Sequence, residues 1–406
     1  MKVDSIQNVS DQTRPVLMIG MLMLAVFFTA ASRAIYSPLM PILQNELGIS
    51  LSTAGTLFLL ITISYTPAIL FSGFLAARIG HGNTIVFSLA SISIGLLLTA
   101  FAHGITMLGT GLILIGAGAG VYPPSGVVMI NTKISLERRS TAYSFHEIGP
   151  NLAFLLSPLI VLVLEPICGW RGVLGWMAAV CSLAALSFWR WGTSGSGVGA
   201  APDFSTVRSI LRLRSTFVGM FLLAAALAGL QGVYAILPAY LVSEHSFSPH
   251  HVNSLLTVSR IASVLLLLQA GVIIKFLGKR KTIVWSLLFT GLLTGLIGLA
   301  NEDWVHIVVV AQPALLAVMF PAILSAIADI GESRYQNITY ALIITVGVNF
   351  GGGLTPAVLG IFGDIGLGWL GFVALAGFMF AAVLYLTAAP DFGNDQEPLH
   401  ETIYEG

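Results

Sequence analysis

Hydrophobic residues along this chain gather into long stretches that contain few charges. A helix of about 20 apolar residues is long enough to cross the roughly 30 Å hydrocarbon core of a bilayer. The pattern therefore predicts an all-α membrane protein of twelve transmembrane helices. The predicted spans lie near residues 16–43, 52–76, 84–103, 106–131, 140–165, 170–190, 214–241, 251–277, 282–300, 304–329, 335–361 and 367–388.

The first six spans and the last six repeat one another. Residue types recur at a constant offset of 198 positions, as Gly73 and Gly271 do. The other pairs in this register are Tyr36 and Tyr234, Gly80 and Gly278, Thr84 and Thr282, Pro123 and Pro321, Gly149 and Gly347, Asn151 and Asn349, and Pro158 and Pro356. A repeat of six spans keeps its orientation, so the two halves are predicted to run parallel, related by an axis along the membrane normal.

The repeat also predicts the domain organisation. An N-terminal six-helix half covers residues 1–190, and a C-terminal half covers residues 214–390. Residues 191–213 between them are first rich in Gly and Ser and then basic, which is typical of a flexible connector. Residues 391–406 are predicted to form an acidic tail.

The basic residues predict the orientation in the membrane, because Lys and Arg are retained in cytoplasmic loops during insertion. All but three of the 18 Lys and Arg residues fall on one side of the predicted spans, the exceptions being Arg33, Arg171 and Arg260. Loops on the other side carry acids, including Glu302 and Asp364. We expect a multi-pass protein of the plasma (bacterial inner) membrane with both termini in the cytoplasm.

The composition argues against several other functions. Charged residues are only 9% of the chain and the net charge is zero, so there is no basic footprint for nucleic acid. Cys168 and Cys181 lack the spacing of metal ligands, and the phosphate-binding motif of ATPases is absent. The sequence predicts no metal, no cofactor, no nucleic-acid partner and no enzymatic activity.

The loop between the second and third spans resembles the signature Gly-x-x-x-Asp-Arg-x-Gly-Arg-Lys of the major facilitator superfamily through Gly73, Arg78 and Gly80. The second half repeats the resemblance through Gly271, Gly278, Lys279 and Arg280. The resemblance covers essentially the whole chain, and it implies two six-helix halves around a central cavity that alternately opens to each side. A simpler interpretation of the loop is that its glycines allow close helix approach and its cations set the topology.

Two arginines lie within predicted spans, Arg33 in the first and Arg260 in the eighth. An Arg at mid-span costs at least ~2.5–3.5 kcal/mol, so it usually faces a cavity or a partner. Each lies about ten residues from the outer end of its span, which places both at a depth of about 15 Å. A planar guanidinium donates two hydrogen bonds to a carboxylate or phosphate, so the pair predicts an anion site. The alternative is a structural role in a latch between the halves.

The segment from Arg33 to Met40 and Pro41 resembles the first span of glycerol-3-phosphate and related organic-anion transporters, where an Arg at this spacing binds substrate. The second Arg of that family is replaced here by Gln231. An Arg in the eighth span, with the glycines of residues 347–353, is similar instead to oxalate and nitrate carriers. The resemblance implies an anionic substrate and leaves its class open.

Further polar residues in the spans are candidates to orient a substrate by hydrogen bonds. They are Tyr36, Tyr122, Gln231, Tyr234, Gln312, Asn151 and Asn349. For each of them, a hydrogen bond between helices is an equally good interpretation.

Glu147 is the clearest acid within a span. A Glu147–Arg260 pair that forms and breaks during transport would couple substrate binding to a proton, because an arginine and burial shift a carboxyl in opposite directions. The alternative is a surface acid that pairs with Arg138 or Arg139. His146 beside it either titrates near neutral pH or simply packs. The predicted coupling and gating residues are Glu147, His146, Asp329 and Arg78.

The sequence thus predicts a secondary active transporter that moves a small anion, such as an organic carboxylate, by proton symport or anion exchange. The expected partners are the substrate, protons or a counter-anion, and the lipid bilayer, and we expect a monomer. The alternative is multidrug efflux by proton antiport, since Gly149 and Pro150 resemble part of the antiporter motif. Arginines in a cavity would repel the cationic drugs that such exporters usually carry.

Overall fold

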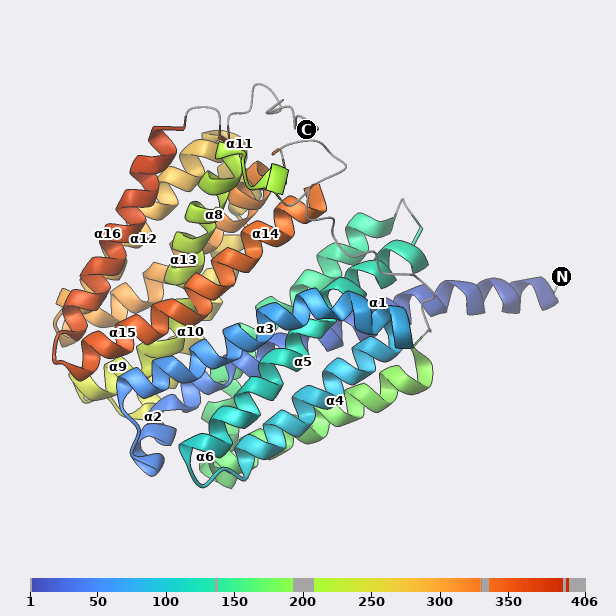
Figure 1. The fold of residues 1–406 in the computed structure, drawn as a ribbon, viewed down its shortest axis with the longest axis horizontal. Coiled ribbons are helices and arrows are strands. Elements are labelled where there is room, and N and C mark those ends of the chain that lie inside the picture. Colours follow the sequence, from blue (N-terminus) through green and yellow to red (C-terminus); the bar gives the residue numbers. More distant parts are fainter. Residues whose placement is uncertain are drawn as a thin grey trace. The chain divides into compact units, whose positions relative to one another are not determined.

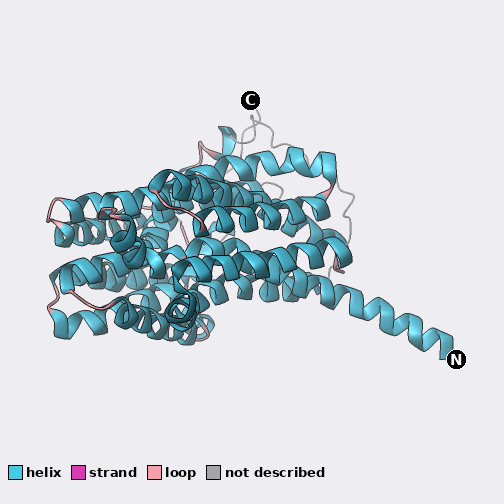
Figure 2. Ribbon diagram, turned by 90° about the horizontal axis from the view of Figure 1, so that it is seen from below, coloured by secondary structure: helices cyan, strands magenta, loops and turns pink. Residues whose placement is uncertain are grey.

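The computed structural model describes residues 2–135, 138–192, 208–328, 330, 336–389 and 392–393. In these ranges the regular elements are helices (Figure 2). Most of the predicted linker (193–207) and nearly all of the predicted tail lie outside the described residues, as does Asp329.

The first six predicted spans are formed by five stretches of helix (Figure 1). They are α1 (Lys2–Ala34) with α2 (Tyr36–Leu47), α3 (Leu51–Ile79), α4 (His81–Ala100), α5 (Ile105–Lys133) and α6 (Arg139–Trp191). The long α6 contains two predicted spans and bends at Gly169, where φ is 66°. Glycine has no Cβ and adopts this left-handed conformation without strain.

Within the described residues, the last six predicted spans contain three interruptions of regular α-helix. They are α8 (Arg214–Leu227) with η2 (Ala228–Gly232) and α9 (Val233–His245), α10 (Pro249–Leu267) with α11 (Ala270–Leu277), α12 (Lys279–Leu299), α13 (Glu302–Ala328), α14 (Gln336–Val348) with η4 (Asn349–Leu354) and α15 (Thr355–Asp364), and α16 (Gly368–Thr387). The segments η2 and η4 are π-helical, and α10 and α11 meet at a bend of 51°.

The predicted fold class is confirmed. Among the described residues, ten helices are long and apolar enough to cross a membrane, and the bent pair α10 and α11 makes an eleventh candidate. Since α6 alone is long enough for two spans, this agrees with the twelve predicted helices.

The chain packs as two compact units. The first comprises Met1–Leu39 and Leu60–Ala201, in which α1 lies along α6, and α4 packs on α5 and α6. The second comprises Met40–Leu59 and Pro202–Gly406, in which α12 packs on α13 and α16, and α8 packs on α14. The halves predicted from the repeat rest on sequence similarity rather than packing, and they stay a prediction.

The sequence repeat has a counterpart in backbone geometry. Gly80 precedes α4 with φ 80° and ψ 156°, and its repeat partner Gly278 precedes α12 with φ 78° and ψ 159°. The Thr84 hydroxyl donates to the Gly80 carbonyl oxygen at 2.8 Å, and the Thr282 hydroxyl donates to the Gly278 carbonyl oxygen at the same distance. Only glycine adopts this backbone conformation readily, so both copies need it for the same turn.

Other glycines of the repeat mark close helix packing. A Cβ on Gly149 would lie 2.7 Å from the Met23 carbonyl oxygen of α1, and one on Gly347 would lie 3.0 Å from Leu223 of α8. In contrast, a Cβ on Gly73 would meet no atom within 4 Å. Glycine therefore lets α6 approach the α1 backbone and lets α14 pack on leucine side chains of α8, and it serves neither purpose at Gly73.

The start of α3 is capped from a distant part of the second unit. The Asp364 carboxylate at the end of α15 accepts hydrogen bonds from the backbone nitrogens of Leu51 at 2.8 Å and Ser52 at 3.1 Å. The Ser52 hydroxyl also donates to it. A Cβ on Gly360 of α15 would collide with the Leu51 carbonyl oxygen, so the two backbones are in direct contact. The first amides of a helix lack partners within it, and a carboxylate satisfies them well.

Candidate functional site

In the first unit, Arg33 lies near the end of α1 and stacks on an aromatic ring of α3. Its guanidinium carbon is 4.7 Å from the centre of the Tyr65 ring. Its Nε donates to the Thr29 carbonyl oxygen one turn earlier at 2.9 Å. A guanidinium held in this way keeps a fixed plane, which suits it to bind the two oxygens of an anion.

In the second unit, Arg260 of α10 stacks on Tyr234 of α9. The guanidinium carbon is 4.3 Å from the ring centre, and only 6% of the Arg260 surface is exposed. A buried cation in an apolar protein needs compensating contacts, and the negative face of an aromatic ring provides one.

The arginine and the tyrosine come in opposite order along the chain in the two pairs. In the first unit the earlier helix carries the arginine (Arg33) and the later helix the tyrosine (Tyr65). In the second unit the earlier helix carries the tyrosine (Tyr234) and the later helix the arginine (Arg260). Each unit thus holds one of these arginine–tyrosine pairs, although neither arginine has a repeat partner of its own type.

The π-helical segment η2, which carries Gln231, is bonded to a glutamine of α13. The buried Gln312 donates through Nε2 to the Gly229 carbonyl oxygen at 3.0 Å and to Thr294 at 3.1 Å. Gln312 therefore fixes the irregular backbone of η2. Gln231, on the same segment, is partly exposed. Breaks in α-helical hydrogen bonding occur often at functional sites.

Of three other predicted residues, Tyr36 bonds to another helix, whereas Asn151 and Asn349 bond to the carbonyl one turn earlier. The Tyr36 hydroxyl is buried and lies 2.6 Å from the Thr99 hydroxyl of α4. Asn151 donates to the Glu147 carbonyl oxygen at 2.9 Å, and its repeat partner Asn349 donates to the Thr345 carbonyl oxygen at 2.8 Å. These bonds use one polar group of each side chain, so a role in substrate binding stays a prediction for all three.

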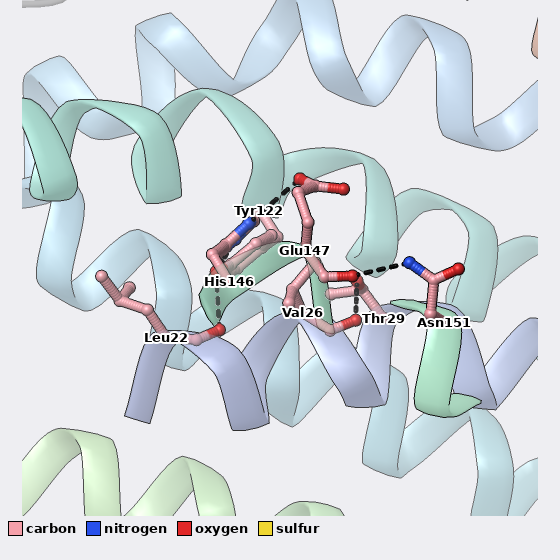
Figure 3. A network of polar contacts seen from close by, with 7 residues as sticks. All are labelled: Leu22, Val26, Thr29, Tyr122, His146, Glu147 and Asn151. Atoms are coloured by element: carbon pink, nitrogen blue, oxygen red, sulfur yellow. Dashed lines mark hydrogen bonds and ion pairs between the residues drawn. The ribbon is translucent and has the colours of Figure 1, made fainter. Parts of the chain in front are cut away.

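Three predicted residues form one polar network in the first unit (Figure 3). The Tyr122 hydroxyl of α5 lies 2.9 Å from His146 Nε2 of α6 and 2.9 Å from the Leu22 carbonyl oxygen of α1. His146 Nδ1 lies 3.3 Å from the Glu147 carboxylate. The rings of Tyr122 and His146 are nearly parallel, with an angle of 5° between their planes. The network joins three helices, and the Tyr122 hydroxyl of α5 is the group that contacts both α1 and α6.

The remaining coupling and gating residues are less constrained. Arg78 is exposed at the end of α3. The Arg139 Nε donates to the Ile134 carbonyl oxygen at 3.2 Å, and the Glu147 carboxyl contacts His146 at 3.3 Å. The predicted Glu147–Arg260 pair stays a prediction.

Among the residues that the structure describes, no group of three or more His, Cys, Asp or Glu side chains is placed to hold a metal ion. His251 and His306 do meet, with their Nε2 atoms 2.9 Å apart, but as a pair.

Sequence reasoning missed Tyr65, Thr99 and the carbonyl of Leu22. Tyr65 and Thr99 are polar residues within spans, which is a signal of partnership, but the sequence does not show the partner. A backbone carbonyl such as that of Leu22 gives no signal at all, because every residue has one.

Known proteins resemble the chain in sequence. A probable sulfoacetate transporter, SauU, of Cupriavidus necator is 22% identical over 155 residues, 38% of this chain and 36% of SauU. A probable L-galactonate transporter of Escherichia coli is 27% identical over 157 residues, 37% of this chain and 34% of the relative. The quinolone resistance protein NorA of Staphylococcus aureus is 20% identical over 273 residues, 66% of this chain and 70% of NorA. The chain thus matches about a third of the length of the two organic-anion relatives.

The fold is also found in solved structures. A bacterial homologue of the human lysosomal transporter Spinster, in an inward-facing and occupied conformation, aligns with a TM-score of 0.72 at 15% identity, over 93% of this chain and 97% of that one. At this identity the likeness shows the fold alone. The sequence model of the Major Facilitator Superfamily matches residues 22–245 and 216–402, which together span nearly the whole chain. The chain therefore belongs to the Major Facilitator Superfamily.

Proposed function

We propose that this secondary transporter carries a small organic anion of the carboxylate or sulfonate type. The observation that carries the proposal is the pair of stacked arginines, one in each compact unit. Placing an arginine within a membrane span costs free energy, and such residues typically mark a substrate or ion pathway or pair with another group.

The geometry of Arg33 favours binding of an anion. Its Nε donates to the Thr29 carbonyl oxygen, and one face of the guanidinium is covered by the Tyr65 ring. The two Nη nitrogens form no hydrogen bond to any residue that the structure describes, so they can donate to two oxygens of one anion. A neutral sugar would leave the guanidinium charge without compensation, whereas a carboxylate or sulfonate would neutralise it.

The relatives support the same class of substrate. The names of two of them specify organic anions, sulfoacetate and L-galactonate, and sulfoacetate carries both a sulfonate and a carboxylate. Both of these groups are planar or trigonal anions of the kind that a guanidinium binds through two hydrogen bonds. We propose proton symport or anion exchange as the energy source, with the protein in a bacterial inner membrane and both termini in the cytoplasm.

Drug efflux is the second candidate, because the match to NorA covers 66% of the chain. The described polar groups in the spans argue against cationic drugs. The one acid among the predicted site residues in described spans, Glu147, is paired with His146, while both arginines present positive charge. A cationic drug would need the opposite arrangement.

The two candidates are separated by ligand-induced thermal stabilisation of the purified protein. The panel contains sulfoacetate, galactonate, a simple dicarboxylate, a phosphate ester and a quinolone. A ligand at 100 times its Kd adds about 2.7 kcal/mol to stability, which a melting curve resolves. We expect sulfoacetate or a carboxylate to stabilise the wild type, and Arg33→Gln and Arg260→Gln each to remove that effect.

Arg171→Gln is the matched control. Arg171 also stacks on an aromatic ring, that of Trp170, at 4.1 Å, but it lies beside the bend of α6 and bonds to the Ala102 carbonyl. This variant should keep the ligand response. Stabilisation by the quinolone alone, or an anion response that survives both Arg33→Gln and Arg260→Gln, would refute the anion proposal.

A further inference from the structure

The network of Tyr122, His146 and Glu147 has a fixed order of hydrogen-bond donors (Figure 3). The Leu22 carbonyl oxygen can only accept, so the single hydroxyl hydrogen of Tyr122 points to it over 2.9 Å. The Tyr122 oxygen must then accept from His146, and the ring nitrogen that donates is Nε2, also at 2.9 Å. The tautomer of His146 follows from these two bonds.

The remaining contact requires one more proton. With Nε2 protonated, a neutral His146 has a lone pair on Nδ1, and that nitrogen faces the Glu147 carboxylate at 3.3 Å. A lone pair and a carboxylate repel each other. The contact is attractive only when a proton lies between them, either on Nδ1 as an imidazolium or on the Glu147 oxygen as a carboxylic acid. Both forms hold the same number of protons.

The contact between His146 and Glu147 is the place where a proton can enter the network. From α5, Tyr122 is the titratable group that faces it, and α1 contributes the Leu22 carbonyl and the apolar Met23 and Val26 beside Gly149. The His146 side chain is 9% exposed and that of Glu147 is 67% exposed. An ionisable side chain within a span faces the bundle interior or a water-filled cavity, so Glu147 is the end of the network that water reaches.

We propose that Tyr122, His146 and Glu147 form a one-proton switch that changes a hydrogen bond to α1. When the proton leaves, Glu147 becomes a carboxylate and His146 stays neutral. The attractive arrangement is then Nδ1–H donating to Glu147, which leaves Nε2 as an acceptor. Tyr122 turns its hydroxyl hydrogen from the Leu22 carbonyl to Nε2. The loaded network holds three exchangeable protons and the empty one holds two, so one proton is released.

The switch acts on the helix that carries Arg33. Leu22 and Arg33 lie on α1, and α1 is in backbone contact with α6 at Gly149, close to the histidine in the chain. In the loaded form Tyr122 ties α1 to α5, and in the empty form this tie is lost. The inference deepens the proposed function and rests on it for its role in transport, because it supplies the site of the coupled proton. The protonation chemistry itself can be measured without any substrate.

The first test is ¹⁵N NMR of histidine-labelled protein in liposomes between pH 5 and pH 8. His146 is assigned as the signal lost in His146→Gln. We expect its neutral form at high pH to carry the hydrogen on Nδ1, whereas its low-pH form carries one on Nε2. Infrared spectra of the same samples should show the Glu147 carboxyl changing in the same pH step.

The matched variants are Glu147→Gln and Glu165→Gln, which remove one acid each from α6. In Glu147→Gln the introduced side-chain amide can donate to Nδ1 at every pH, so we expect the His146 tautomer to stay fixed with Nε2 protonated. Glu165 lies 18 positions further along α6, outside the network of Figure 3, and its variant should behave as the wild type does. Melting curves verify that both variants are folded. A wild-type His146 that keeps Nε2–H throughout, or that titrates independently of Glu147, would overturn the proposal.

Transport in proteoliposomes separates this proposal from the proposed function. With sulfoacetate as the probe, Glu147→Gln should lower the ratio of pH-gradient-driven uptake to sulfoacetate exchange at least tenfold, and Glu165→Gln should not change it. If no anion on the panel is transported but the tautomer exchange is observed, the proposed substrate is wrong and the switch stands. If anions are transported with an unchanged ratio in Glu147→Gln, the switch does not couple transport and this inference fails.

Discussion

The carboxylate of Asp364 should stabilise the second unit through the start of α3. It accepts from the amides of Leu51 and Ser52 and from the Ser52 hydroxyl. Replacing a capping Asp by Ala costs about 0.5–2 kcal/mol, and hydrogen bonds to a charged group reach about 1.5–3 kcal/mol. Because Asp364 is exposed, solvent screening reduces the gain, and we expect a loss of about 1.5 kcal/mol for Asp364→Ala.

The measurement is thermal unfolding in detergent, followed by tryptophan fluorescence. One kcal/mol shifts Tm by about 2–4 °C in a cooperative unit of 150–250 residues, so Asp364→Ala should melt about 3–6 °C lower. Asp364→Asn keeps one acceptor oxygen and should lose roughly half as much. Asp303→Ala removes an exposed acid from the first turn of α13 and should cost no more than about 0.5 kcal/mol.

The interpretation of Asp364 as a cap would be refuted by a Tm of Asp364→Ala equal to that of the wild type. It would also be refuted if Asp303→Ala lowered the Tm as much, because a general charge effect would then account for both.

Three further predictions concern single side chains, each tested by melting curves. Gly80→Ala should cost about 1–3 kcal/mol, because φ is 80° there, whereas Gly73→Ala in an open helical position should be neutral or stabilise by up to about 1 kcal/mol; equal effects would contradict this. Gln312→Leu should cost about 1–3 kcal/mol, because the Gly229 carbonyl loses its donor, and an unchanged Tm would show that this bond is unimportant. Arg280→Gln should cost about 1–2 kcal/mol, because Arg280 donates to three carbonyls after and within the last turn of α16, and Lys281→Gln serves as its control.

The sequence was sufficient to predict the helices and the turns that depend on a single residue type. Long apolar stretches predict spans directly, since the membrane requires each backbone group to be satisfied within its own helix. The pair Gly80 and Gly278 was found from the repeat, and both adopt the same positive φ. Such features depend on local chemistry, so the sequence alone reveals them.

The partners of side chains on other helices could not be predicted, because they depend on how each helix is rotated about its axis. The sequence places Arg33 within a span, but its contact with Tyr65 depends on how the ends of α1 and the middle of α3 are turned toward each other. The bond between Tyr122 and Leu22 joins residues 100 positions apart, and no pattern in either segment indicates it. The π-helical geometry of η2 and η4 also went unpredicted, since glycines in a span are compatible with an ordinary helix.

The cap on α3 has a consequence for biosynthesis. Leu51 and Asp364 are separated by 313 residues, yet they belong to the same compact unit. At a translation rate of about 5–20 residues per second, Asp364 is synthesised roughly 15–60 s after the amides at the start of α3 that it caps. During that interval α3 has left the ribosome without the partner that holds its first turn. Until α15 is made, water satisfies these exposed amides, so the first turn of α3 is held less firmly than in the complete protein.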